Sequence, residues 1–247
     1  MLTTIGLLYL RIGENMRAFD FLGNSLTHDP KNARTILAAG SIIQDHSDMD
    51  VALIKYRVAA VQTPNSAQLW NNVGMCFFGK GRHVAAIACL KKALYLDPFE
   101  WIVSYNLGLV HLTTVHPHAP PPLLPSSSRG PCRRWAQQQY ASAFHYLSAS
   151  INLKPDFASS YMQLGICLAR LDDPENACLS YQKAIEMETD FLFHLNYAVT
   201  LANLGRADDA RAQLDAFDTL YAEADEATRE ADPEVPLLAQ RLRSTRS

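Results

Sequence analysis

Long hydrophobic runs, an excess of one charge and paired cysteines are all missing from this chain of 247 residues. No apolar run approaches the roughly 18–20 residues that a membrane-spanning helix needs, so we expect no direct membrane span. Lysine and arginine total 22 against 25 for aspartate and glutamate. This near balance gives no reason to expect nucleic acid or an anionic membrane as a partner. The five cysteines form no CxxC pair, which favours reduced thiols in the cytoplasm.

Signatures of catalysis are also missing. Neither a Ser/His/Asp nor a Cys/His pattern with a local signature occurs, and no two carboxylates are placed in an obvious cleft. His116 and His118 are potential metal ligands, but they lie in a proline-rich stretch without nearby partners. Residues 74–80 resemble the start of a phosphate-binding loop, yet Gly81 replaces the required Ser or Thr. We therefore predict a protein that is not an enzyme and that binds no cofactor or metal.

What the sequence does contain is a period of 34 residues. The glycines at this spacing are Gly6, Gly40, Gly74 and Gly108. Alanine follows the first three of them after twelve residues and proline after twenty-four, at Ala18, Ala52, Ala86 and at Pro30, Pro64, Pro98. Apolar residues recur at helical spacing around each glycine and after each alanine, which predicts two amphipathic helices per period. A 34-residue helix-turn-helix period is typical of tetratricopeptide-repeat (TPR) arrays.

Small residues in these columns have a mechanical explanation, because antiparallel helices about 8–10 Å apart leave little room where they cross. Six repeats can be counted, of which the fifth carries Gly165 and the sixth has Ala198 in the glycine column. In the fourth repeat the alanine and the proline both arrive 23 residues late, at Ala143 and Pro155, which indicates an insertion in its turn. We therefore predict an all-α TPR α-solenoid, a right-handed superhelix of about six helix-turn-helix repeats.

The repeats divide the chain into four parts. Residues 1–113 hold the first to fourth repeats, and we expect the first to be truncated because the chain starts within a helical stripe without a cap. Residues 114–137 contain six prolines and no acidic residue, which predicts a Pro/Ser-rich disordered insert or a gene-model artefact. Residues 138–221 complete the fourth to sixth repeats. Residues 222–247 form a charged tail that is either a capping helix over the last repeat or disordered.

The concave face of the superhelix is the predicted binding surface, because first helices line it in such arrays. Two residues before the glycine column, four of the six residues are amides. Amide side chains both donate and accept hydrogen bonds, so a ladder of them can bind an extended peptide backbone. The predicted partner-binding residues are Asn71, Asn72, Tyr105, Asn106, Gln163 and Asn196. The alternative, which the sequence leaves equally open, is that these asparagines tie adjacent helices together.

Lysine is missing from the columns three residues before and one residue after the glycine. Chaperone-docking TPR modules hold a C-terminal carboxylate with lysines and an arginine beside such asparagines. We therefore do not expect a carboxylate clamp. The groove should be apolar and amide-lined and should prefer a helix or a folded segment of a partner.

Three runs carry a more specific resemblance, because they include groove and surface residues that the repeat consensus does not dictate. They are residues 69–80 (LWNNVGMCFFGK), 105–113 (YNLGLVHLT) and 139–145 (QYASAFH). Through them the chain resembles the Bardet-Biedl syndrome 4 family, TPR subunits of the BBSome, over roughly residues 1–221 apart from the insert. The resemblance implies a non-catalytic scaffold subunit of a coat-like complex that carries membrane proteins into and out of cilia.

The same resemblance implies partners and a location. The partners would be other BBSome subunits, centriolar satellite proteins and the dynein–dynactin machinery. The location would be the cytoplasm, the cilium, the ciliary basal body and the centrosome with its satellites. The alternative is a free-standing TPR adaptor or co-chaperone that binds peptide segments in its concave groove.

Overall fold

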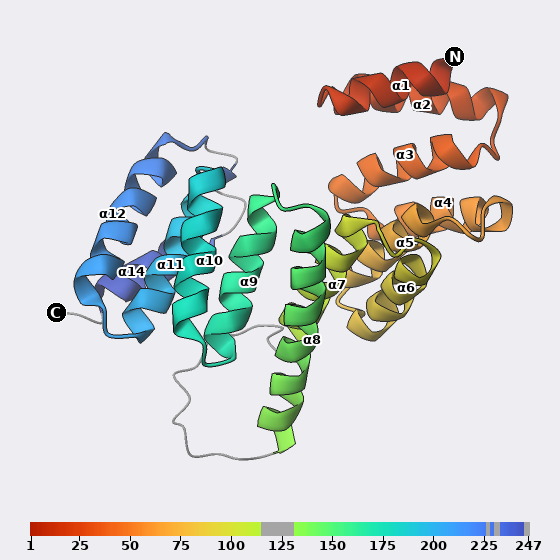
Figure 1. Cartoon of the computed structure of the whole chain (residues 1–247). Helices are drawn as coiled ribbons and strands as arrows, with labels where there is room; N and C mark the ends of the chain where they lie inside the picture. The colour runs from red at the N-terminus through yellow and green to blue at the C-terminus, as the bar shows by residue number, and fades with distance from the viewer. Residues whose placement is uncertain (115–130, 226–227, 230–232, 245–247) are drawn as a thin grey trace. The chain divides into compact units, whose positions relative to one another are not determined.

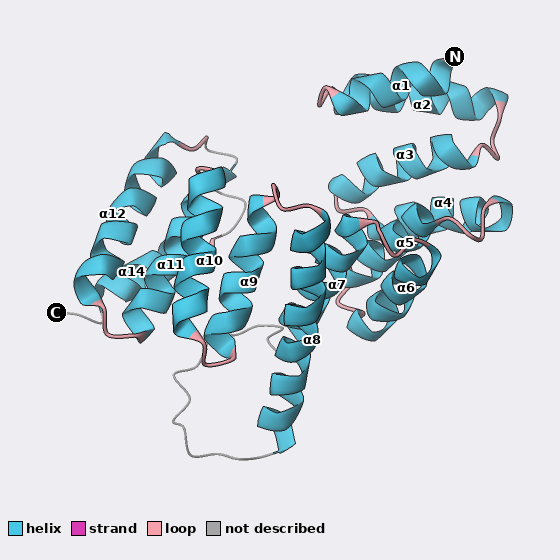
Figure 2. Ribbon diagram, viewed as in Figure 1, coloured by secondary structure: helices cyan, strands magenta, loops and turns pink. Residues whose placement is uncertain are grey.

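The computed structural model describes residues 1–114, 131–225, 228–229 and 233–244. Within these ranges the chain forms thirteen helices and no strand (Figures 1 and 2). The first helices of the repeats are α1 (Leu2–Arg11), α3 (Ala33–Asp45), α5 (Ala67–Gly79), α7 (Trp101–Thr114), α9 (Ala158–Arg170) and α11 (Phe191–Asn203). The second helices are α2 (Asn15–His28), α4 (Met49–Gln62), α6 (His83–Leu96), α8 (Pro131–Leu153), α10 (Pro174–Met187) and α12 (Ala207–Glu223), and α14 (Glu234–Ser244) follows. The predicted all-α TPR solenoid is confirmed.

One left-handed residue recurs in the turn between the two helices of a repeat. The residues with positive φ are Gly13, Ser47, Gly81, Asp172 and Gly205, at φ values of 80°, 64°, 68°, 62° and 74°. They occupy equivalent places after α1, α3, α5, α9 and α11, where a left-handed residue ends a helix and reverses the chain. Glycine adopts this conformation without the Cβ penalty that other residues incur, which accounts for three of the five.

The small-residue columns lie where the two helices of a repeat touch, as the sequence predicts. A Cβ atom added to Gly40 would lie 2.4 Å from Cε1 of Tyr56, and one added to Gly74 would lie 2.8 Å from Cγ of Leu90. The facing column of the second helices consists of alanines that are completely buried, namely Ala18, Ala52 and Ala86. Larger side chains in either column would therefore push the paired helices apart.

The helices group into two compact units, Met1–Val110 and His111–Ser247. In the first unit, a buried cluster around Tyr56 and Leu69 joins α3, α4 and α5. In the second unit, a cluster around Tyr181 and Phe193 joins α9, α10 and α11. Each cluster includes the first helix of the following repeat, so a repeat is stabilised by its neighbour as well as by its own helix pair.

The predicted insert is shorter than expected on its C-terminal side. Helix α8 begins at Pro131, so the expectation that residues 131–137 are disordered is wrong. The physical reason is that proline suits the first position of a helix, and the next residues (CRRWAQ) contain no further proline or glycine to interrupt it. On the other side, Thr114 belongs to α7. Residues 115–130, the rest of the predicted insert, lie outside the described residues.

The tail contains the capping helix that was one of its two predicted forms. Val235 and Ala239 of α14 are buried, 7% and 1% exposed, in one cluster with Leu195 of α11 and Phe217 of α12. Leu238 and Leu242 pack against the same cluster. None of the helices described is both long and apolar enough to cross a bilayer.

Candidate partner-binding surfaces

Two of the predicted groove amides bind each other across neighbouring repeats. Asn106 of α7 donates from Nδ2 to Oδ1 of Asn71 of α5 over 2.8 Å. Both side chains are buried, with 6% and 9% of their surfaces exposed. A buried amide must have a hydrogen-bond partner, and here each supplies the other. The helix-tying alternative therefore fits this pair.

The hydrogen bonds continue from this pair through three helices of the first unit. Asn71 donates from Nδ2 to Oδ1 of Asn72 over 3.3 Å, and Asn72 donates to the hydroxyl of Tyr56 over 3.4 Å. Tyr56 in turn donates to Oε1 of Gln44, 3.4 Å away, and the thiol of Cys76 donates to the same oxygen over 3.3 Å. Burial raises the pKa of Tyr56, so the phenol stays protonated and can donate. We call these side chains the amide network.

The remaining predicted residues are less buried. Tyr105 of α7 is half-buried in the first unit. Gln163 of α9 and Asn196 of α11 are half-buried in the second unit, where Asn196 donates to the backbone carbonyl of Leu192 over 2.8 Å. The side chain of Gln163 forms no hydrogen bond with any described residue. The structure thus brings Asn71, Asn72 and Asn106 together, whereas Gln163 and Asn196 belong to separate helices of the other unit.

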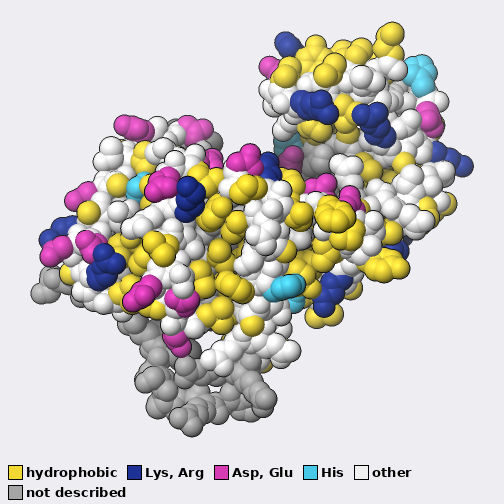
Figure 3. Space-filling model, in the orientation of Figure 1, with side chains coloured by type: hydrophobic (Ala, Val, Ile, Leu, Met, Phe, Trp, Pro, Cys, Tyr) yellow, Lys and Arg dark blue, Asp and Glu magenta, His cyan; other side chains and the backbone are white. Residues whose placement is uncertain are grey.

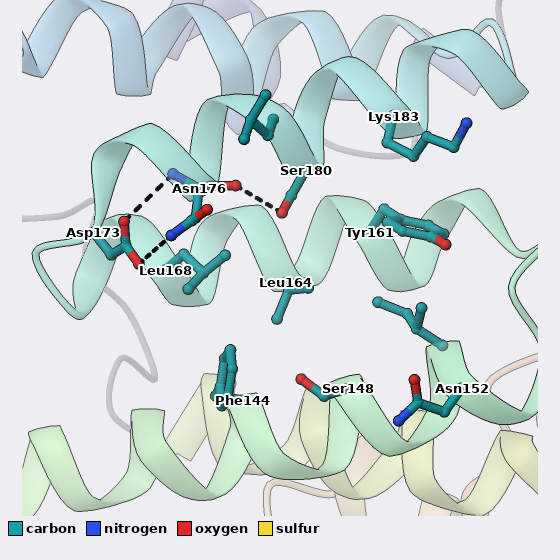
Figure 4. A pocket seen from close by; sticks show the side chains of 12 residues that line it. Phe144, Ser148, Asn152, Tyr161, Leu164, Leu168, Asp173, Asn176, Ser180 and Lys183 are labelled. Carbon is teal, nitrogen blue, oxygen red and sulfur yellow. Dashed lines mark hydrogen bonds between the residues drawn. The ribbon is translucent and has the colours of Figure 1, made fainter.

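A groove of about 500 Å³ lies between α8, α9 and α10 of the second unit (Figure 4). Leu164 points from α9 toward α8, Phe144 points back from α8 toward α9, and Leu168 of α9 also lines the groove. At one end, Asp173 accepts a hydrogen bond from Nδ2 of Asn176 over 2.8 Å. Figure 3 shows hydrophobic side chains gathered over α9 and α10 on the face in view. The volume and the apolar floor suit a side chain or short segment of a partner.

The next repeat builds the same groove with different side chains. A hollow of about 420 Å³ lies between α10, α11 and α12. Its lining residues His194, Tyr197 and Leu201 stand 33 positions after Tyr161, Leu164 and Leu168. Polar pairs occupy the second groove, where His194 Nδ1 lies 2.8 Å from Oε1 of Gln213 and Arg206 pairs with Asp209. One groove therefore suits an apolar segment and the other a polar one.

The sequence pattern predicts that the lining of the first groove belongs to the helix core. Tyr161, Leu164 and Leu168 fall on the predicted apolar stripe of the fifth repeat, and they do pack against the core cluster. Tyr161 and Leu164 are only half-buried, so they also form the floor of the groove. The sequence signal that could have indicated the groove was the leucine at position 179 of α10. In the structure Leu179 is 62% exposed and adds an apolar wall that the repeat does not need.

The buried thiols do not have the properties of nucleophiles. Burial raises the pKa of Cys76 to about 11 and that of Cys167 to about 12, so both stay protonated near neutral pH. Cys89 and Cys178 are also free thiols. Among the residues that the structure describes, no group of three or more His, Cys, Asp or Glu side chains is placed to hold a metal ion.

Comparison with known proteins agrees with the repeat and adds a specific relative. Residues 67–99 and 158–191 each match the tetratricopeptide repeat family. The BBSome complex member BBS4 of Bos taurus is 47% identical over 98% of this chain, and that of Mus musculus is 48% identical over 98%. The BBSome complex member BBS4 homolog of Drosophila melanogaster is 36% identical over 88% of the chain. The matches cover 43%, 42% and 42% of these relatives, so the chain spans less than half of their length.

Solved structures support the fold alone. PilW, a type IV pilus biogenesis factor, superposes with a TM-score of 0.72 at 21% identity over 94% of this chain and 97% of its own. The Cut9–Hcn1 hetero-tetramer of the APC/C superposes with a TM-score of 0.76 at 16% identity over 98% of this chain and 42% of its own. Their identities are too low to carry function across, because repeat solenoids serve many unrelated roles.

Proposed function

The chain belongs to the tetratricopeptide-repeat proteins and is a relative of BBSome complex member BBS4, and from this premise we propose that it is a non-catalytic scaffold subunit of the BBSome. Its task would be to bind other subunits through the surfaces of its repeats. The observation that carries the proposal is an identity of nearly one half, maintained over 98% of the chain. The repeat alone would be compatible with many unrelated binding roles.

The structure supports a role in binding through features that the repeat itself does not require. The apolar groove between α8, α9 and α10 and its polar counterpart one repeat later offer two different surfaces on one helical frame. Hydrophobic pockets with a few polar groups at their ends are typical of binding sites. Rigid, regularly spaced helices also hold such surfaces at fixed distances, which a scaffold in a multi-subunit complex needs.

Within this proposal, the predicted partner-binding residues divide into two roles. Asn71 and Asn106 would position α5 and α7, because each is buried against the other. Asn72, Tyr105, Gln163 and Asn196 are half-buried and would contact partners directly. Replacing Gln163 with alanine should weaken the binding of a partner without lowering the stability of the chain, since the side chain of Gln163 bonds to no described residue. Replacing Asn106 with alanine should lower stability and partner binding together.

We further propose that the complex is coat-like and moves membrane proteins into and out of cilia. Centriolar satellite proteins and the dynein–dynactin machinery would be its additional partners. The protein would accordingly be found at the ciliary basal body and at the centrosome as well as in the cilium and cytoplasm. These expectations come from the resemblance to the BBSome subunit rather than from any single side chain.

Affinity purification of the tagged chain from ciliated cells tests the proposal. Stoichiometric recovery with other BBSome subunits would support it, and Leu179→Asp at the exposed wall of the apolar groove should reduce that recovery. Recovery mainly with chaperones would contradict it and favour a co-chaperone instead. The groove columns hold no lysine for a carboxylate clamp, which already weighs against the co-chaperone role.

A further inference from the structure

Helix α4 is apolar on two faces, although only one of them packs inside the repeat. The inner face is completely buried and consists of Ala52, Tyr56 and Ala59. The outer face carries four β-branched aliphatic side chains, which we call the α4 stripe: Val51 (38% exposed), Ile54 (60%), Val58 (40%) and Val61 (78%). Their spacing of three, four and three residues places them on one side of the helix, over about 15 Å of its length.

The other repeats show that the fold does not require this stripe. In α2 the four equivalent positions are Arg17, Asp20, Asn24 and Thr27. In α10 they are Asn176, Leu179, Lys183 and Glu186. The equivalent sets in α6, α8 and α12 each contain at least one polar or charged residue as well. Valine and isoleucine are also weaker helix formers than alanine or lysine, so an exposed helix gains nothing from four of them unless they make a contact.

Basic side chains border the α4 stripe on both sides. With 100° of rotation per residue, Lys55 and Arg57 lie about 80° to either side of the centre of the stripe. Both are exposed, and neither forms an ion pair with a described residue. The acidic residue nearest the stripe, Asp50, is already paired with Lys80. The borders of the stripe therefore carry two cationic side chains that form no ion pair within the described part of the chain.

We propose that the α4 stripe is the docking site for an amphipathic helix of a partner protein, with an apolar face and acidic residues beside it. Helices that bind in this way place apolar side chains three or four residues apart against an apolar surface, and the side chains of the stripe also alternate at intervals of three and four residues. Acidic flanks pair with Lys55 and Arg57 and exclude partners with basic flanks. This inference rests on the proposed scaffold role and names the chemistry of one partner segment.

A pair of synthetic peptides tests the inference with the full chain. Each is an amphipathic helix of about 20 residues with leucine along one face. One carries glutamate on both flanks and the other carries lysine at the same positions. We expect fluorescence anisotropy to show the glutamate peptide binding about tenfold more tightly, with the difference shrinking as salt is raised. Equal affinity of the two peptides would overturn the inference.

Variants taken from the other repeats locate the site. Ile54→Asp with Val58→Asn gives α4 the residues that α2 has at these positions, and both sites are exposed enough for the chain to keep its fold, as circular dichroism would show. Binding of the glutamate peptide should fall about tenfold or more. Lys55→Glu with Arg57→Glu should reverse the preference in favour of the lysine peptide. Unchanged binding in the first variant, or an unchanged preference in the second, would overturn the inference.

Two controls distinguish the α4 stripe from other exposed aliphatic side chains and from a second copy of the chain. Val84→Asp changes a valine of α6 that is 86% exposed and should leave peptide binding unchanged, whereas a loss equal to that of Ile54→Asp with Val58→Asn would overturn the inference. Analytical sedimentation of the free chain should show a monomer. A dimer that Ile54→Asp with Val58→Asn abolishes would instead identify a second copy of the chain as the occupant of the stripe, and would overturn the inference. Recovery of BBSome subunits from cells is a separate readout, so the proposed function can fail while the peptide result holds, and the reverse.

Discussion

Replacing Gly40 with alanine tests the close contact on which the repeat is built. The new Cβ would lie 2.4 Å from Cε1 and 2.8 Å from Cζ of Tyr56, where carbon atoms normally stay about 3.5–4.0 Å apart. Tyr56 is completely buried and belongs to the amide network, so its ring cannot swing away. We expect overpacking to cost about 2–3 kcal/mol, against a gain of about 1 kcal/mol in helix propensity. The net effect is a loss of about 1–2 kcal/mol.

Gly23→Ala is the matched control, because Gly23 also lies inside a helix but has no atom within 4 Å of an added Cβ. It should stabilise the chain by about 0.5–1 kcal/mol. Because the chain forms two compact units, a single unfolding transition would not report the stability of the mutated unit alone. Native-state hydrogen exchange of the backbone amides of α2, α3 and α4 is therefore the better assay. If Gly40→Ala protects these amides as well as Gly23→Ala does, the proposed reason for the glycine column is wrong.

Three other changes probe packing, the amide network and a buried thiol. Ala86→Arg should cost several kcal/mol by forcing a charge into a completely buried position, and an unchanged melting temperature would contradict this. Asn71→Ala and Asn106→Ala should each cost about 1–3 kcal/mol, with a coupling in the double mutant that independent sites would lack. Burial raises the pKa of Cys76 to about 11, so the folded chain keeps a proton that the unfolded chain loses above about 9. Urea unfolding should therefore show stability falling from pH 9 toward 11, and less steeply in Cys76→Ala.

The repeat could be predicted from the sequence because close packing of two helices restricts a few positions to one or two residue types. Gly40 and Ala52 recur at fixed intervals for that reason, and their contacts are those expected. The start of α8 could not be predicted, since prolines and arginines before Gln137 are compatible with either a loop or a helix N-terminus. The amino-acid composition describes the segment as a whole, whereas the residue at which a helix begins depends on the few residues of its first turn.

The candidate site was harder to predict than the fold for a different reason. Asn71 and Asn106 stand 35 residues apart, and only the lateral packing of α5 against α7 decides whether their amides meet each other or point to a partner. Spacing within one helix contains no information about that contact. Gln163 is also an amide and stands two residues before its glycine, in the same column as Asn106, yet its side chain bonds to no described residue. The column alone therefore could not separate positioning amides from those available to a partner.

Internal repeats provide a comparison that a single-copy domain lacks. Positions that hold a small residue in every repeat report the demands of the fold, as Gly40 and Gly74 do. Positions that differ between repeats while the backbone stays the same must have another cause. Two surfaces depart from the repeat in this way. The leucine-lined groove differs from its polar counterpart one repeat later, and the aliphatic outer face of α4 differs from the polar face at the equivalent positions of α2. Because the fold tolerates polar residues at these places, contacts with partners best account for their apolar side chains, and these surfaces are where mutation should separate binding from folding.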